Sequence, residues 1–188
     1  MALDVYTKTC AKNVGGNYQK VFFGASGDVT AVTVSSTPFE LTAITNATKF
    51  KAFTAEIDSV QYKSEGQGSA NYFTTQTLTL KFAKKTKELV AALEELKAQA
   101  SCGIIAIHVD GNGVAWLDGY DARATDPNAR PFNKIKVSFD SGLKPSDEAG
   151  NQVTVELTRE SEWPNIPFDS TMSAAILGGT ATAYITYS

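Results

Sequence analysis

Apolar and polar residues alternate with a period of two along most of this chain, and this pattern favours a fold built from β-strands. In the clearest case, residues 72–82, Leu78, Leu80 and Phe82 fall on one side while threonine and lysine fall on the other. Such a strand has one dry face and one wet face. The same alternation appears in five further segments: 28–34, 49–62, 135–139, 153–157 and 180–187. The 21 threonines suit these strands, because threonine favours a pleated, half-buried surface.

One segment, residues 86–101, has the periodicity of a helix instead. Its apolar residues, from Leu89 to Ala100, recur at helical spacing. Thr86 is placed to cap the first turn, and Gly103 follows the last turn as a stop signal. A helix of about 15 residues is marginal on its own, so we expect its apolar stripe to pack on a sheet.

A hairpin is predicted directly after this helix, within residues 103–120. Two apolar runs flank the sequence Asp110-Gly111-Asn112-Gly113. Glycine and asparagine adopt positive φ at low cost, so this tetrapeptide is a strong signal for a tight turn. From residue 72 to residue 120 the sequence therefore predicts strand, helix, strand, turn and strand in succession.

The whole chain fits one domain, since its 188 residues lie within the usual size of about 100–200. We predict a mainly β fold over residues 1–188: a two-sheet sandwich or barrel with one flanking amphipathic α-helix. The segments between the predicted elements are long and polar: 35–48, 62–71, 120–134, 141–151 and 160–179. Loops this long are usually functional or disordered, so we expect them to contact neighbouring subunits.

Charge and targeting signals limit the possible partners. The chain has 17 basic and 20 acidic residues, and its net charge of −3 argues against general affinity for duplex nucleic acid. No apolar run approaches the roughly 18 residues that span a bilayer, and the N-terminus does not have the pattern of a secretory signal. We expect synthesis in a cytoplasm, no membrane partner, and reduced thiols at Cys10 and Cys102.

Patterns that would indicate catalysis or metal binding are scarce. His108 is the single histidine, so no paired histidines are available for a zinc site. Cys102 precedes it by six residues, which is roughly 20 Å along an extended strand and too far for a nucleophile–base pair. We interpret His108 as a strand histidine that faces a polar neighbour or an interface, and residues 110–113 as a turn rather than a calcium loop. The sequence predicts no enzyme, no cofactor, and no catalytic, cofactor-binding or metal-binding residue.

Aromatic residues indicate where the chain could contact other molecules. Trp116 lies in the predicted hairpin and is expected in the core. Trp163 is flanked by proline, and tryptophan is enriched at interface hot spots, so a subunit contact is favoured there. A core position for Trp163 and stacking on a sugar stay open as alternatives. The candidate interface residues are Trp163, Ile166, Phe168, Phe132 and Phe39.

The middle of the chain resembles the tail tube (major tail) proteins of tailed phages. The resemblance rests on TQTLTLKF, then KKTKELVAALEELKAQAS, then GIIAIHVDGNGVAWLDGY, within residues 72–120. It implies a β-sandwich or barrel with a flanking helix, and hexameric rings that stack into a conduit for DNA. The implied partners are further copies of the chain and other virion proteins, with DNA passing through the lumen without specific binding. The implied location is the virion, assembled in the host cytoplasm.

Other functions fit the same sequence pattern. A tail terminator, a head–tail adaptor or a capsid decoration protein would also be a β-rich virion component without catalytic residues. A β-sandwich module that recognises a glycan or a protein partner through exposed aromatic residues is the alternative from a different class. The tube hypothesis predicts self-assembly, whereas the binding module predicts a monomer or small oligomer.

Overall fold

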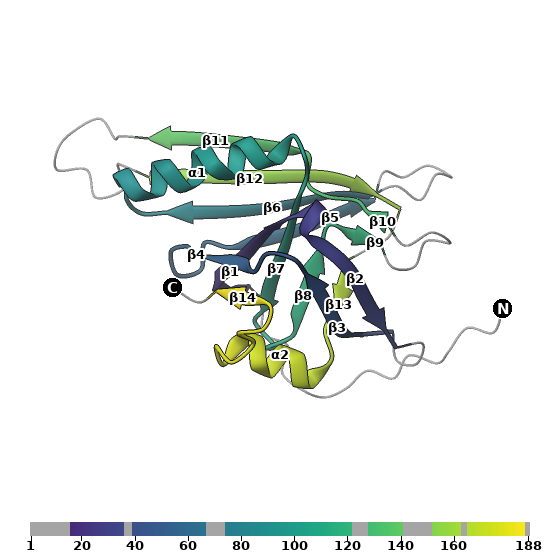
Figure 1. Cartoon of the computed structure of the whole chain (residues 1–188). Helices are drawn as coiled ribbons and strands as arrows, with labels where there is room; N and C mark the ends of the chain where they lie inside the picture. The colour runs from purple at the N-terminus through teal and green to yellow at the C-terminus, as the bar shows by residue number, and fades with distance from the viewer. Residues whose placement is uncertain are drawn as a thin grey trace.

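The computed structural model confirms a mainly β fold and describes residues 16–35, 39–66, 74–121, 128–140, 152–162 and 165–186 (Figure 1). The helices are α1 (Lys87–Ala100) and α2 (Ser170–Leu177), with a 3-10 turn η1 (Ser26–Asp28). The strands are β1 (Asn17–Ala25), β2 (Val29–Val34), β3 (Leu41–Asn46), β4 (Phe50–Thr54), β5 (Gln61–Gly66), β6 (Thr74–Phe82), β7 (Ile104–Asp110), β8 (Ala115–Asp118), β9 (Tyr120–Asp121), β10 (Asn128–Ala129), β11 (Lys134–Asp140), β12 (Gln152–Ser161), β13 (Ile166–Pro167) and β14 (Ile185–Thr186).

Two larger sheets and two small ones contain these strands. The central sheet has the order β13-β8-β7-β1-β4-β14, and a four-stranded sheet has the order β11-β12-β6-β5. The pairs β2–β3 and β9–β10 form the small sheets. Among the pairs within the described ranges, β14 with β4 is parallel and the others are antiparallel.

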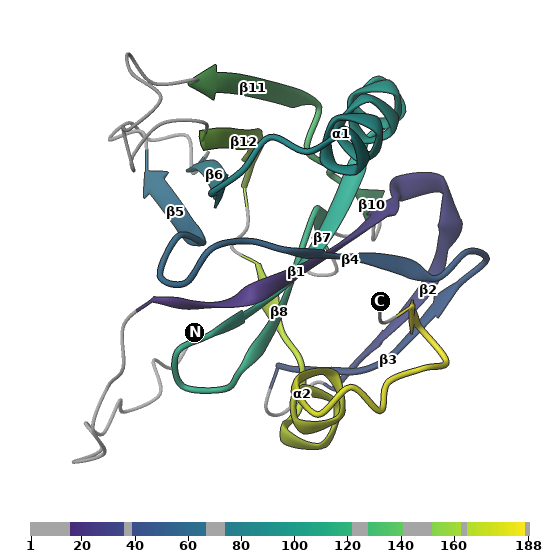
Figure 2. The same ribbon diagram turned by 90° about the vertical axis from the view of Figure 1, so that its left-hand side faces the viewer.

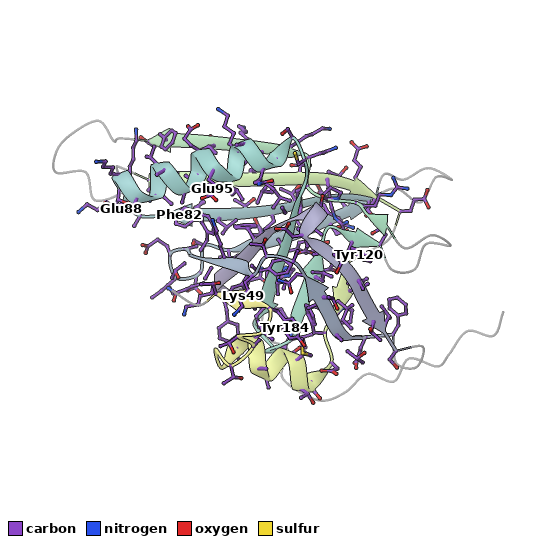
Figure 3. All side chains as sticks on the ribbon, in the orientation of Figure 1. Lys49, Phe82, Glu88, Glu95, Tyr120 and Tyr184 are labelled. Atoms are coloured by element: carbon purple, nitrogen blue, oxygen red, sulfur yellow. The ribbon has the colours of Figure 1, made fainter. Side chains whose placement is uncertain are left out.

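The central sheet lies between two other layers, as Figure 2 shows. On one face, Val21, Phe23 and Ile104 pack with Leu80 and Leu157 of the four-stranded sheet, and α1 closes this core. Side chains fill the space between the layers (Figure 3). We call the core between these two sheets the first core. Two sheets that face each other across one core are compatible with a sandwich-like arrangement.

The opposite face of the central sheet is covered by β2–β3 and by α2. The edge strands β13 and β14 of the central sheet add side chains to the same core. Four residues of the C-terminal segment are buried there, each no more than 2% exposed: Ile166, Phe168, Ile176 and Ile185. They belong to one core with Phe22 of β1 and a set of β7 and β8 side chains: Ile105, Ile107, Val109, Ala115 and Leu117. The molecule therefore has two apolar cores separated by one sheet.

Strand β7 serves both cores because its side chains alternate between the two faces. Ile104 and Ala106 belong to the first core, whereas Ile105, Ile107 and Val109 belong to the second. A strand buried on both faces is expected to be a nearly continuous apolar run rather than an alternating one. This explains why β7 opens with four consecutive apolar residues, Ile104 to Ile107.

The predicted helix and hairpin are confirmed. The Thr86 hydroxyl accepts a hydrogen bond from the Leu89 N–H at 3.1 Å and caps α1. The hairpin pairs β7 with β8, and Asp110 accepts hydrogen bonds from the Asn112 and Val114 N–H groups in the turn. Gly113 has φ +83°, which glycine adopts more easily than other residues.

Several predicted loops contain secondary structure instead, so their assignment was wrong. Segment 35–48 contains β3, segment 62–71 contains most of β5, and segment 160–179 contains β13 and α2. Helix α2 adds a second helix to the one that was expected, and the Asp169 carboxylate caps it by accepting from the Met172 N–H at 2.7 Å. Within the described part of the predicted C-terminal strand, residues 180–186, only the two residues of β14 are in a strand. Segment 141–151 lies outside the described residues.

No helix within the described ranges has the length and apolar character needed to cross a membrane.

Candidate functional site

A group of polar side chains is buried between the central sheet and the four-stranded sheet. We call this group the polar cluster: Gln76, His108, Asp118, Asp121, Arg159 and Ser161. These residues come from β6, β7, β8, β9 and β12, so the cluster depends on five strands being correctly placed. Burying polar groups is costly unless they find hydrogen-bond partners, so the contacts of each member determine what the cluster can do.

Arg159 is the centre of the larger part of the cluster. Its Nε donates to Gln76 Oε1 at 2.6 Å, and its Nη1 donates to the Arg130 carbonyl at 2.8 Å. The same Nη1 lies 3.6 Å from Asp121 Oδ1. The Ser161 hydroxyl lies 2.9 and 2.7 Å from the two carboxylate oxygens of Asp121. Arg159 thus ties β12 to β6 and to the segment before β11.

At Asp121, burial has a larger effect on the pKa of the carboxyl than the favourable groups around it. Burial raises the pKa of the Asp121 carboxyl above its ordinary value. The hydrogen bond from Ser161 and the positive charge of Arg159 oppose this shift but do not cancel it. The folded protein therefore holds a proton at Asp121 more readily than the unfolded chain does.

His108 and Asp118 form the second part of the cluster. His108 Nδ1 lies 2.6 Å from Asp118 Oδ2, and both side chains are almost completely buried. The Tyr62 ring stacks on the imidazole, with 5.0 Å between ring centroids and 19° between the planes. The prediction that His108 faces a polar neighbour is confirmed. Sequence analysis missed Asp118, although the turn at residues 110–113 brings both residues to the same side of the hairpin.

Three buried side-chain atoms in and around the polar cluster have no hydrogen-bond partner among the residues that the structure describes: Tyr62 Oη, Asp118 Oδ1 and Arg159 Nη2. Burial, and then the negative charge of Asp118, raises the pKa of the Tyr62 hydroxyl above its ordinary range, so this group stays protonated. The charge of Arg159 opposes the shift, as do Ser64 and the Asn165 backbone, which lie close to the hydroxyl without forming a hydrogen bond of good geometry.

A cavity of about 390 Å³ opens in front of Tyr62 and His108. Its lining residues are Gly16, Asn17, Val60, Gln61, Tyr62, His108, Asp110, Trp116 and Asn165. Trp116 was expected in the core but is only half-buried, and its Nε1 donates to Asp110 Oδ2 at 3.0 Å. The walls come from the start of β1, from β5, from the β7–β8 hairpin and from Asn165 before β13. No local sequence motif connects these segments.

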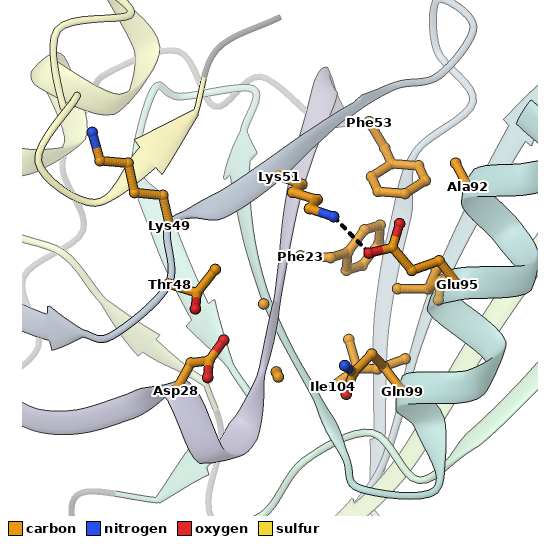
Figure 4. A pocket seen from close by; sticks show the side chains of 13 residues that line it. Phe23, Asp28, Thr48, Lys49, Lys51, Phe53, Ala92, Glu95, Gln99 and Ile104 are labelled. Carbon is orange, nitrogen blue, oxygen red and sulfur yellow. Dashed lines mark hydrogen bonds and ion pairs between the residues drawn. The ribbon is translucent and has the colours of Figure 1, made fainter. Parts of the chain in front are cut away.

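A second, smaller cavity of about 120 Å³ lies between α1 and strands β1 and β4 (Figure 4). Lys51 of β4 and Glu95 of α1 form an ion pair of 2.6 Å beside it, and Figure 4 draws this pair between the rings of Phe23 and Phe53. Both charged side chains are more than half exposed, so solvent screens their attraction and the pair adds little stability. This cavity contains no acid–base pair of the kind seen at His108.

The candidate interface residues lie mostly inside the chain's own core. Ile166, Phe168 and Phe132 are each no more than 2% exposed, so their side chains are not offered to a second subunit in this fold. Phe39 is half-buried against the second core. Trp163 lies outside the described residues.

Groups that would support metal or thiol chemistry are not assembled in the described part of the chain. It contains no cluster of three or more His, Cys, Asp or Glu side chains that could hold a metal ion. Cys102 is a free, exposed thiol at the end of α1, whereas His108 is buried within β7. Cys10 lies outside the described residues.

Comparison with protein-family models, with curated proteins and with solved structures finds no match.

Proposed function

We propose that this chain is a self-assembling structural subunit of a virion, and specifically a tail tube protein whose copies form stacked, hexameric rings around a DNA conduit. One observation carries this proposal: the four-stranded sheet has a completely polar outer face and ends in two strands, β5 and β11, that each have one neighbour within the described residues. The sandwich-like facing of two sheets beside α1 supports the same proposal.

The outer face of the four-stranded sheet is defined by register. Leu78, Leu80, Val155 and Leu157 point into the first core, so the residues between them point away from it. The outward residues are Gln61, Lys63, Glu65, Thr75, Thr77, Thr79, Lys81, Lys134, Lys136, Ser138, Asp140, Gln152, Thr154, Glu156, Thr158 and Glu160. Four are lysines and four are carboxylates, so the formal charge of the face is zero. A polyanion sliding along it would be neither strongly held nor strongly repelled.

The two edge strands suit closure by identical copies. An edge strand exposes backbone N–H and C=O groups that favour pairing with another strand. All neighbours in this sheet are antiparallel, so β5 and β11 run in opposite directions. If β11 of one copy meets β5 of the next, the antiparallel pattern continues without a break. A head-to-tail contact of this kind makes a ring when its rotation closes.

The test is the native mass of the purified protein at rising concentration, with negative-stain images of the same samples. Hexamers, rings or tubes are expected. A stable monomer of 20.1 kDa at high concentration would overturn the proposal.

Proline substitutions then test the edge itself, because proline removes one backbone donor. Neighbouring residues of an edge strand direct their N–H groups alternately toward and away from the sheet. Lys63→Pro and Ser64→Pro each remove one of two neighbouring N–H groups, of which one points away from the sheet. The variant that loses this outward N–H is expected to keep its circular dichroism spectrum and lose assembly. Thr77→Ser on β6 is the matched control and should assemble like the wild type. Assembly by both proline variants would exclude β5 as the contact.

A further inference from the structure

The cavity in front of His108 is a candidate ligand site that is independent of assembly. We propose that it binds one unit of a neutral, hydroxyl-rich molecule, such as a single sugar residue. Its volume of about 390 Å³ lies within the range of about 300–1,000 Å³ that small-molecule sites occupy. The chemistry of its walls selects the ligand class.

His108 supplies a ring nitrogen for hydrogen bonding at the inner wall. Its Nδ1 faces Asp118 Oδ2 at 2.6 Å, so Nε2 is the ring nitrogen left for a second partner. His108 has no second partner among the described residues. The residue is 2% exposed and lines the cavity, and a hydroxyl can both donate and accept, so a ligand hydroxyl at Nε2 would satisfy a group that is otherwise costly to bury.

The charges at the cavity favour a neutral ligand. Asp110 is the charged residue among the described lining residues, and three N–H groups already occupy its carboxylate: those of Asn112, Val114 and the Trp116 ring. Among these described lining residues there is no lysine or arginine, so they offer no counter-charge to an anion such as phosphate. A cation would have to displace the hydrogen bonds that hold the turn.

Amide and aromatic side chains complete the walls. Asn17 donates from Nδ2 to the Val60 carbonyl and keeps Oδ1 as an acceptor, and Asn165 adds a further amide group. Trp116 is held in place by Asp110, so its ring offers a fixed apolar surface. Several donors and acceptors around one aromatic ring match a molecule with many hydroxyl groups and an apolar C–H face.

Saturation-transfer NMR on the full-length protein tests this inference, with methyl glucoside, methyl galactoside, N-acetylglucosamine and inositol as neutral probes. Glucuronate and glucosamine are the charged comparators. Saturation transfer to the ring protons of at least one neutral probe is expected, in unassembled and assembled samples. No transfer to any neutral probe at tens of millimolar, or a preference for the charged comparators, would overturn the inference.

Three variants locate the site. His108→Asn keeps a donor toward Asp118 and removes Nε2, and Asn165→Ala removes one amide with little effect on the fold. Each is expected to weaken binding about threefold to tenfold, the value of one hydrogen bond. Gln152→Ala, on the outer face of β12, should bind like the wild type. Binding that neither His108→Asn nor Asn165→Ala weakens would place the probe elsewhere and exclude this cavity.

Discussion

At the scale of single residues, the fold depends on a few buried polar side chains whose partners come from distant parts of the chain. Arg159 is the largest of them, and it holds Gln76 and the Arg130 carbonyl through hydrogen bonds of 2.6 and 2.8 Å. Removing one partner of a buried charged pair costs far more than the pair itself contributes, because the other partner stays buried and unpaired. The sequence offered no sign of this role, since an arginine within an alternating strand normally points to solvent.

Arg159→Met is therefore expected to destabilise the protein by about 3–5 kcal/mol, because Asp121 loses its neighbouring positive charge and the Arg130 carbonyl loses its donor. Urea unfolding followed by circular dichroism measures the change. The control is Lys134→Met, which breaks a largely exposed ion pair of 3.7 Å with Glu160 and should cost less than about 1 kcal/mol. Equal losses in the two variants would contradict the role given to Arg159.

Asp121 makes stability depend on pH in a specific direction. Its pKa is raised in the folded state, so above about pH 4 the folded protein binds more protons at this site than the unfolded chain. This contribution is fully present below the unfolded pKa and is lost as pH rises through the folded pKa. Asp121→Asn removes it, so the free energy of unfolding of the variant, relative to the wild type, should increase with pH. Urea titrations at a series of acidic pH values would refute this if the difference fell instead.

At the scale of elements, some connections were predictable and others were not. Helix α1 and the β7–β8 hairpin were predicted because each has its own signal, a capped apolar stripe and an Asp-Gly-Asn-Gly turn. Helix α2 was missed because its sequence, STMSAAIL, is short and apolar or small on every side, so it shows no helical contrast between faces. The cavity was missed because its walls come from four separated segments.

The connection between α1 and β7 depends on one glycine. Gly103 has φ +96°, and a Cβ there would lie 2.2 Å from Pro131 Cγ, so Gly103→Ala combines backbone strain with a steric clash. We expect a loss of at least about 1–3 kcal/mol in urea unfolding. Gly27→Ala is the matched control, because a Cβ there meets no atom within 4 Å, and its effect should stay within about 0.5 kcal/mol. Similar losses in both variants would argue against strain at Gly103.

At the scale of the whole molecule, the two cores predict a gradient of stability. Strands β1 and β7 have neighbours on both sides and cores on both faces, whereas β5 has one neighbour and a largely exposed sequence. Amides that open only on global unfolding exchange most slowly, so β1 and β7 should be the most protected in hydrogen exchange, and β5 among the least. Hydrogen exchange should be measured at low protein concentration, so that the proposed assembly does not protect β5. Protection of β5 equal to that of β7 under those conditions would contradict the predicted gradient of stability.

The C-terminal segment has a consequence for how cells make this protein. Residues 166–185 complete the second core through α2 and the edge strands β13 and β14, yet they leave the ribosome after every other strand of the central sheet. Until then Phe22, Ile105 and Leu117 lack their cover, and exposed apolar surface on a growing chain attracts chaperones and promotes aggregation. A premature stop codon just before β13 would therefore release a polypeptide whose second core is only partly covered, by β2–β3. Quality-control proteases are expected to degrade this polypeptide, so it would not persist as a shortened, functional product.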